Sequence, residues 1–191
     1  MAVARGALRG RVAGCAVLLV LGGVAGCTSD AEPSPLPSPT SSPSPSQSST
    51  AAAPSLPPEA EGTSPAAAKA FVRHWIDTLN YAGASGEVEH LRALSHNRCV
   101  SCTAVIEAIS KVYSAGGHYE GAGWAVEAIK YQPLQPRLEP VLVVGVDIAP
   151  QTVLEREGRQ PERFEGGNRS MTFRLARVGS QWVVKQLDQP A

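Results

Sequence analysis

The sequence has no apolar run long enough to cross a bilayer and no cluster of basic side chains. Its longest uncharged apolar stretch, Val12–Gly26, spans about 15 residues, whereas a membrane-spanning helix needs roughly 20. From Cys27 onward the chain carries 14 basic residues, the total of 17 less the three arginines before it, against 17 acidic residues. A mildly acidic chain without a basic patch has no electrostatic footprint for nucleic acid, which excludes nucleic-acid binding.

Signatures of catalysis are also missing. The motifs GxSxG and HExxH do not occur, and there is no phosphate-binding glycine loop. The segment GAGW at 121–124 lacks both the spacing and the following helix of a dinucleotide fingerprint, which indicates a loop. We therefore expect no cofactor.

The first 26 residues have the order of a secretory signal peptide. Arg5, Arg9 and Arg11 precede the apolar stretch, and small residues follow it. The tetrapeptide VAGC occurs twice, but only the copy ending at Cys27 has an apolar run before it; the copy ending at Cys15 has none. Residues 1–26 are therefore predicted to be a removed signal.

Val24-Ala25-Gly26-Cys27 resembles the bacterial lipobox, in which small residues precede a cysteine that becomes the mature N-terminus. The resemblance implies that the Cys27 sulfur receives a diacylglyceryl group and that cleavage follows Gly26. Two acyl chains hold a protein firmly at a membrane, whereas one binds only marginally. We expect a lipid anchor on Cys27 at the extracytoplasmic face of the cell membrane. An ordinary signal peptide with an incidental cysteine is the alternative.

Residues 27–65 form a segment rich in serine and proline. Ten of the chain's 16 prolines lie in it, and it contains no aromatic residue. Such a segment buries too little apolar surface to offset its ordering entropy, so it is predicted to be a disordered tether.

Residues 66–191 have the composition of one globular domain. Ser64 is a plausible N-cap and Pro65 the first residue of a helix that ends near Gly83, with apolar residues at three- and four-residue steps. Two further helices are predicted over Glu87–Leu94 and over Cys99–Ala115, where Gly116-Gly117 ends the third.

Strands follow the helices. Alternating or continuous apolar patterns predict them at Trp124–Tyr131, Val141–Ile148, Thr152–Arg156, Arg163–Phe164, Ser170–Val178 and Trp182–Leu187. Tight turns between consecutive strands indicate an antiparallel arrangement. The predicted class is α+β, with three N-terminal helices packed on one face of a curved antiparallel sheet.

This element order resembles the nuclear-transport-factor-like (SnoaL-like) cone. The segments AFVRHWIDTLNYA, LRALSHNRCVSC and GGHYEGAGWAV are similar to an actinobacterial lipoprotein family known as domain of unknown function 6318 (DUF6318). The resemblance covers roughly the whole globular part, and that family also has a cysteine pair at this place. It implies an exported lipoprotein with a cone fold and implies no activity.

The pair Cys99 and Cys102 is the sharpest local motif. Cysteine pairs of exported proteins lie in an oxidising compartment, where disulfides form. Two cysteines three residues apart in a first helical turn also lie within bridging distance, so we expect a disulfide. A thiol–disulfide activity is one alternative. Zinc binding together with His90 or His96 is another, although no second CxxC supports it.

Five residues are candidates for a pocket between helices and sheet. His74, Asp77 and Tyr81 share a face of the first helix, where a His–Asp pair could act as base and orienter. Tyr119 and Trp124 follow in the strand region. Such residues more often lie on the solvent side of an amphipathic helix.

Three hypotheses follow. The first is a non-enzymatic lipoprotein, membrane-bound through Cys27, that binds a ligand or partner protein of the cell envelope. The second is an enzyme or small-ligand binder with a cone pocket around His74 and Asp77, or around Tyr119 and Trp124. The third is an extracytoplasmic thiol–disulfide protein.

Overall fold

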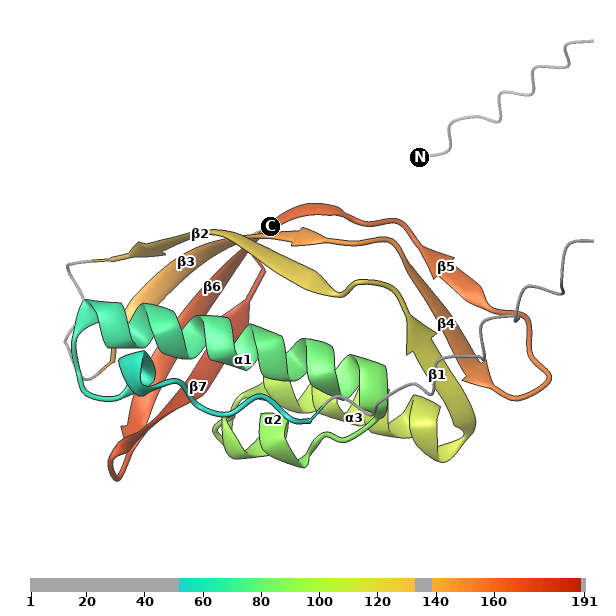
Figure 1. The fold of residues 1–191 in the computed structure, drawn as a ribbon, viewed down its shortest axis with the longest axis horizontal. Coiled ribbons are helices and arrows are strands. Elements are labelled where there is room, and N and C mark those ends of the chain that lie inside the picture. Colours follow the sequence, from blue (N-terminus) through green and yellow to red (C-terminus); the bar gives the residue numbers. More distant parts are fainter. Residues whose placement is uncertain (1–51, 133–138, 190–191) are drawn as a thin grey trace, which may run out of the picture. The chain divides into compact units, whose positions relative to one another are not determined.

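The computed structural model describes residues 52–132 and 139–189, so the predicted signal peptide and Cys27 lie outside the described residues. Three helices precede seven strands within these ranges, as predicted for an α+β fold (Figure 1). The elements are η1 (Pro58–Ala60), α1 (Pro65–Ser85), α2 (Glu89–Ala93), α3 (Val100–Ser114), β1 (Gly116–Glu120), β2 (Trp124–Tyr131), β3 (Val141–Ile148), β4 (Gln151–Arg156), β5 (Glu162–Phe164), β6 (Gly167–Val178) and β7 (Gln181–Asp188). No helix in these two ranges combines the length and apolar character that crossing a membrane requires.

Packed structure begins upstream of the predicted domain boundary at residue 66. The 3₁₀ helix η1 lies within the segment assigned to the tether, and it contacts α1. Its Ala60 is only 2% exposed and belongs to the core, while the Arg177 guanidinium of β6 donates to the Gly62 carbonyl. A small apolar side chain and a backbone carbonyl thus hold this segment on the domain, a contact that composition alone could not reveal.

Helix α1 has the start that its sequence predicts. The Ser64 hydroxyl accepts a hydrogen bond from the Ala67 amide at 3.1 Å, and Pro65 occupies the first turn. The helix continues through Gly83, where the prediction ended it, and stops at Gly86, whose φ of 80° is left-handed. A left-handed glycine is the usual helix C-cap, whereas a glycine inside a helix is tolerated at modest cost.

Helices α2 and α3 are slightly shorter than predicted, and Cys99 caps α3. Cys99 and Cys102 form a disulfide with their Cα atoms 5.2 Å apart, as predicted. The Cys99 sulfur also accepts a hydrogen bond from the Cys102 amide at 3.3 Å. Closing so short a loop contributes about 2 kcal/mol in the chain-entropy model, enough to pin the start of α3 but not to staple the fold.

The strands form two antiparallel ladders, in the order β1-β4-β5 and β2-β3-β6-β7. Strands β2 and β3 have the predicted bounds, and the other four predicted strands are each extended by one to three residues. Strand β1 was not predicted, because Gly116-Gly117 has the pattern of a helix stop. In the fold Gly117 pairs against β4, where a Cβ atom would overlap the Leu154 carbonyl oxygen, so this glycine serves strand pairing.

The two ladders are the halves of one bent surface. Strand β1 leads into β2, β3 into β4, and β5 into β6, each through two or three residues (Figure 1). These breaks lie opposite one another, because Glu120 pairs with Thr152 before the break and Trp124 pairs with Ile148 after it. The predicted single curved sheet is therefore interrupted at its bend.

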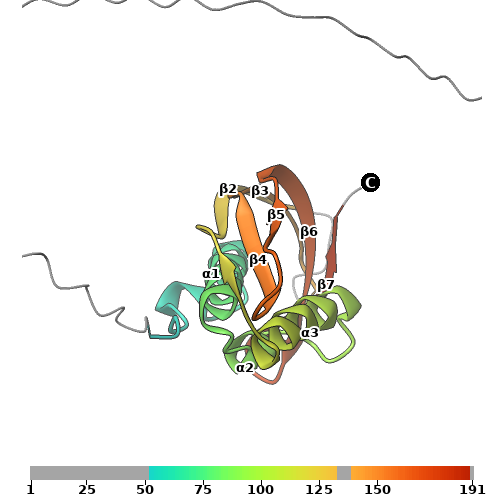
Figure 2. The same ribbon diagram turned by 90° about the vertical axis from the view of Figure 1, so that its right-hand side faces the viewer.

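The helices pack on one face of this surface (Figure 2). Helix α1 contacts β1 and β2, whereas α3 contacts β1, β4 and β7, so both halves of the surface meet helices. At the centre Trp75 of α1 meets Phe173 of β6 edge to face, with ring centroids 5.5 Å apart. The Trp75 indole N–H donates to the Ser95 hydroxyl at 3.0 Å, which satisfies its buried polar atom.

Substituting one glycine at the bend and one in a helix should have opposite effects on stability. In Gly166→Ala the new Cβ would overlap the Ile148 carbonyl oxygen and lie 2.7 Å from the Pro150 nitrogen. We expect it to lower the free energy of unfolding by about 1–3 kcal/mol. In Gly83→Ala the Cβ meets nothing within 4 Å, and alanine favours the helix, so stability should rise by about 0.5–1 kcal/mol.

Urea denaturation of both variants against the parent chain measures these changes. A neutral or stabilising Gly166→Ala would show that the backbones at the bend are not held in close contact.

Candidate functional site

Two adjoining cavities lie along α3. The α1 cavity, about 620 Å³, is enclosed by α1, α3, the β1–β2 connection and the segment from Ala52 to Pro54. The β5 cavity, about 580 Å³, lies between α3 and strands β1, β4 and β5. Ala108, Tyr119 and Gln151 line both cavities, so the two share a wall.

Apolar and aromatic side chains dominate the α1 cavity. Leu79 comes from α1, Val105 and Ile109 come from α3, and the aromatic residues are Tyr81, Tyr119 and Trp124. All three predicted aromatic pocket residues therefore line one cavity. Glu120 is the only residue charged at neutral pH among the residues that line it.

Asn80 of α1 binds the backbone of Trp124, the first residue of β2 after the bend. The Asn80 side-chain amide donates to the Trp124 carbonyl at 2.9 Å, and its oxygen accepts from the Trp124 amide at 2.8 Å. Gly123 makes this approach feasible, since a Cβ there would overlap the Asn80 side-chain oxygen, and its φ of 78° is left-handed. Sequence reasoning missed Asn80, because its partner lies 44 residues away. The glycines at 121 and 123 were the only local hint of a close approach.

Two tyrosines, Tyr81 and Tyr119, line the α1 cavity as neutral phenols, and a third, Tyr113, stacks on Tyr119. Tyr113 and Tyr119 stack with ring centroids 6.3 Å apart, and the Tyr113 hydroxyl donates to the Gly83 carbonyl at 2.7 Å. Burial raises the pKa of Tyr113 and, with smaller contributions from Tyr113 and Glu155, that of Tyr119. The hydrogen bond from the Tyr81 hydroxyl to Glu87 raises the pKa of Tyr81. At neutral pH these phenols can donate hydrogen bonds but cannot act as bases.

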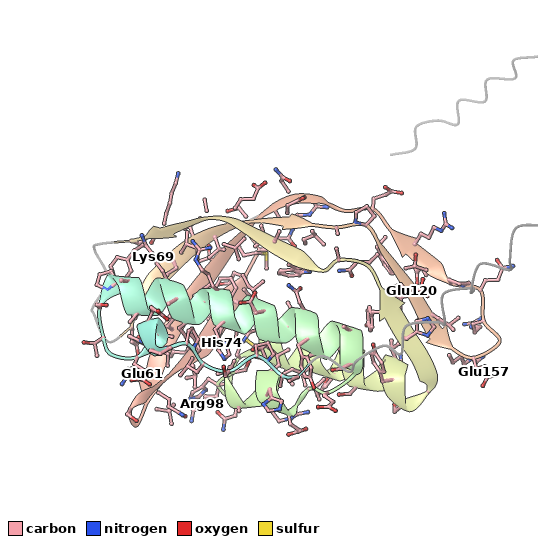
Figure 3. The ribbon with its side chains drawn as sticks, viewed as in Figure 1. Glu61, Lys69, His74, Arg98, Glu120 and Glu157 are labelled. Carbon is pink, nitrogen blue, oxygen red and sulfur yellow. A yellow bond between two sulfur atoms is a disulfide. The ribbon has the colours of Figure 1, made fainter. Side chains whose placement is uncertain are left out.

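His74 and Asp77 are placed elsewhere. His74 is 6% exposed on α1, Asp77 is exposed, and neither lines the α1 or the β5 cavity (Figure 3 labels His74). Burial lowers the pKa of His74, against the opposing charge of Asp77. The five predicted pocket residues thus separate into an aromatic group at a cavity and a His–Asp pair that lines neither cavity, because His74 lies seven residues, about two helical turns, before Tyr81 along α1.

The disulfide is buried at the start of α3. Cys99 is 1% exposed and Cys102 is not exposed, whereas reactive cysteines lie in partly exposed sites. The bridge also removes the two thiolates that the zinc alternative requires. Within residues 52–132 and 139–189 no group of three or more His, Cys, Asp or Glu side chains is placed to hold a metal ion.

The β5 cavity carries most of the charge. Lys111, Arg156 and Arg159 line it together with Glu155 and Glu162. The Arg159 guanidinium lies 3.9 Å from the Glu155 carboxylate. Phe164, which is 48% exposed, adds an apolar surface. None of these residues was predicted as a site residue, since each is ordinary in its local sequence.

These features define an α+β domain in which helices pack on a bent antiparallel surface, with a mainly apolar cavity beside α1 and α3. The chain belongs to the family of unknown function DUF6318, whose model matches residues 38–188. The resemblance of the sequence to this family is thereby confirmed. No protein of curated function matches the chain.

Three solved structures are partly similar to this chain. The intermembrane-space region of the chloroplast protein ARC6 is 10% identical, covering 65% of this chain and 95% of that chain with a TM-score of 0.47. A candidate scytalone dehydratase from Novosphingobium aromaticivorans is 12% identical, with coverages of 65% and 85% and a TM-score of 0.42. A variant whose name contains NTF2 is 11% identical, with coverages of 64% and 99% and a TM-score of 0.36.

The burial of His74 should make the domain less stable in mild acid. Its pKa is lowered in the folded state, so the unfolded chain binds the proton more readily, and the free energy of unfolding should fall as the pH drops below about 6.5. In His74→Phe, which keeps an aromatic ring in the core, this part of the loss should disappear. Urea midpoints at pH 7.5 and 5.5 measure the difference.

His90→Gln is the matched control, because His90 is exposed on α2. It should keep the acid sensitivity of the parent chain. Equal acid sensitivity in His74→Phe and the parent chain would show that burial of His74 does not cause the effect.

Proposed function

We propose that this protein is a lipid-anchored binding module of the extracytoplasmic membrane face, and that it takes a mainly apolar molecule in the α1 cavity. The observation that carries this proposal is the cavity itself. Its volume of about 620 Å³ falls in the range of roughly 300–1,000 Å³ that is usual for ligand sites. Its walls combine apolar and aromatic side chains with a few polar groups, as such sites do.

Binding accounts for the cavity better than catalysis does. A general base works best when its pKa lies near the working pH, yet burial and hydrogen bonding raise the pKa of Tyr81 and of Tyr119. The carboxylate that lines the cavity, that of Glu120, is exposed and lies 3.1 Å from His118 (Figure 3 labels Glu120). It is therefore not a buried general base. Burial of the Cys99–Cys102 disulfide argues against a thiol–disulfide function, because a reactive cysteine must be accessible.

Anchoring is supported by the sequence around Cys27. The basic, apolar and small-residue order precedes a cysteine in a lipobox-like tetrapeptide. The chain from Cys27 to Ala52 is 25 residues long, which corresponds to a length of about 80 Å at the polyproline II rise of 3.1 Å per residue. Since Ala52 and Pro54 line the α1 cavity, the tether would join the domain at its binding site.

A bulky side chain at position 108 should block the cavity. Ala108 is exposed on α3 and lines both cavities, so the phenyl ring of Ala108→Phe would occupy cavity space without disturbing the buried core. We expect it to weaken binding of the neutral apolar dye Nile red by tenfold or more. Fluorescence titration of the chain from residue 27 onward, carrying Cys27→Ser so that no acyl chain competes, measures this affinity.

The control is Ala104→Phe, one turn earlier on α3. Ala104 is also exposed but lines neither cavity, so this variant should bind the dye as the parent chain does. Similar affinities for both variants would place dye binding outside the α1 cavity.

The anchor is tested in the full chain. Cys27→Ser removes the thiol that would carry the lipid, and we expect no incorporation of labelled palmitate and accumulation of the unprocessed precursor. Cys15→Ser, which changes the other VAGC copy, should leave labelling and processing intact. Labelling that persists in Cys27→Ser would contradict the assignment of Cys27.

A further inference from the structure

The two cavities form one trough along α3. Val105, Ala108 and Ile109 line the α1 cavity, whereas Ala108, Lys111 and Val112 line the β5 cavity. Residues three and four apart lie on one face of a helix, so these positions form a continuous stripe. Ala108, which has a small side chain, lines both cavities and lies at their junction.

The ends of this trough differ in charge. Glu120 is the charged residue of the α1 cavity, whereas the β5 cavity has three cations and two carboxylates. Among the described residues Arg159 is paired with Glu155, and neither Lys111 nor Arg156 takes part in an ion pair. Glu162 has no ion-pair partner among these residues either, so the β5 cavity offers two unpaired cations against one unpaired carboxylate, while the carboxylate of Glu120 disfavours an anion at the other end.

Apolar surface continues up to these cations. Phe164 is 48% exposed in the wall of the β5 cavity, and the ring of Tyr119 lines both cavities. Strand β5 alternates its side chains, so Glu162 and Phe164 line the cavity while Arg163 does not. An elongated ligand would thus meet apolar surface along its body and positive charge at one end.

We propose that the trough binds a single-chain amphiphile with an anionic head group. The acyl chain lies in the α1 cavity, and the head lies between Lys111 and Arg156. This inference rests on the proposed binding function and names the chemical class of its ligand. A free long-chain carboxylate and the head of an anionic membrane lipid share this chemistry, and the experiment separates the two sources.

The test compares oleate with oleyl alcohol, which has the same chain and no charge. Each displaces Nile red from the chain from residue 27 onward carrying Cys27→Ser, at pH 8, low salt and concentrations below micelle formation. The parent chain should bind oleate several-fold more tightly than oleyl alcohol. Because exposed charge pairs contribute little to affinity, Lys111→Ala and Arg156→Ala should each weaken oleate binding by up to about five-fold. Neither variant should alter oleyl alcohol binding.

Arg163→Ala removes an exposed cation from the same strand as Phe164 but outside the cavity, and it should change neither affinity. Equal binding of oleate and oleyl alcohol would overturn the anionic head while leaving the apolar cavity in place. If neither displaces the dye, the amphiphile proposal fails; the proposed function fails as well only if Nile red binds Ala108→Phe as tightly as the parent chain. Co-sedimentation with phosphatidylglycerol vesicles, lost in Arg156→Ala and unaffected by oleate, would overturn the free single-chain ligand in favour of a membrane lipid.

Discussion

The close approach of three backbones at the bend is the constraint on which the rest of this structure depends. Three chain segments interrupt the strands at the same level, and each contains a residue with little or no side chain. At Gly121 a Cβ would lie 2.8 Å from the Pro150 carbonyl oxygen, and at Gly166 it would overlap the Ile148 carbonyl oxygen. Absent side chains let the strands bend together, and the bent surface faces the helices that enclose the cavities.

The bend also explains why the binding region lies where it does. Trp124 begins β2 directly after the break, and Asn80 of α1 satisfies both of its backbone groups. That two-point contact ties the helix layer to the sheet beside the α1 cavity. On the other side the Tyr113 hydroxyl joins α3 to the last turns of α1 through Gly83. Polar contacts between elements thus bound the cavity, while most of its lining residues are apolar or aromatic.

The two apolar regions of the domain, the buried core and the trough along α3, serve different purposes. The core around Trp75 and Phe173 is buried, and the Trp75 indole N–H in it is hydrogen-bonded, which provides stability. The trough along α3 is open and lined by small and aromatic residues, which leaves room for a ligand at a cost in packing. The disulfide at the start of α3 holds the helix that forms the floor of this trough.

Much of the fold follows from local sequence. The helix cap at Ser64, the apolar stripe of α1 and the continuous apolar strand β3 all depend on neighbours within a few residues, so periodicity and capping rules identify them. The disulfide was predictable for the same reason, since its cysteines share one helical turn. Strand β1 and the end of α1 were mispredicted, because Gly117 and Gly83 serve contacts and conformations that local rules assign to helix stops.

The sequence by itself determined the class of the domain, its helices and most of its strands, and the family to which it belongs, because these depend on short-range patterns. Only the tertiary structure decided which candidate residues meet. Tyr81, Tyr119 and Trp124 converge on one cavity, whereas His74 is buried about two helical turns before Tyr81 and does not line that cavity. Lys111 and Arg156 lie 45 positions apart in the chain and come to one cavity only because β4 packs beside α3.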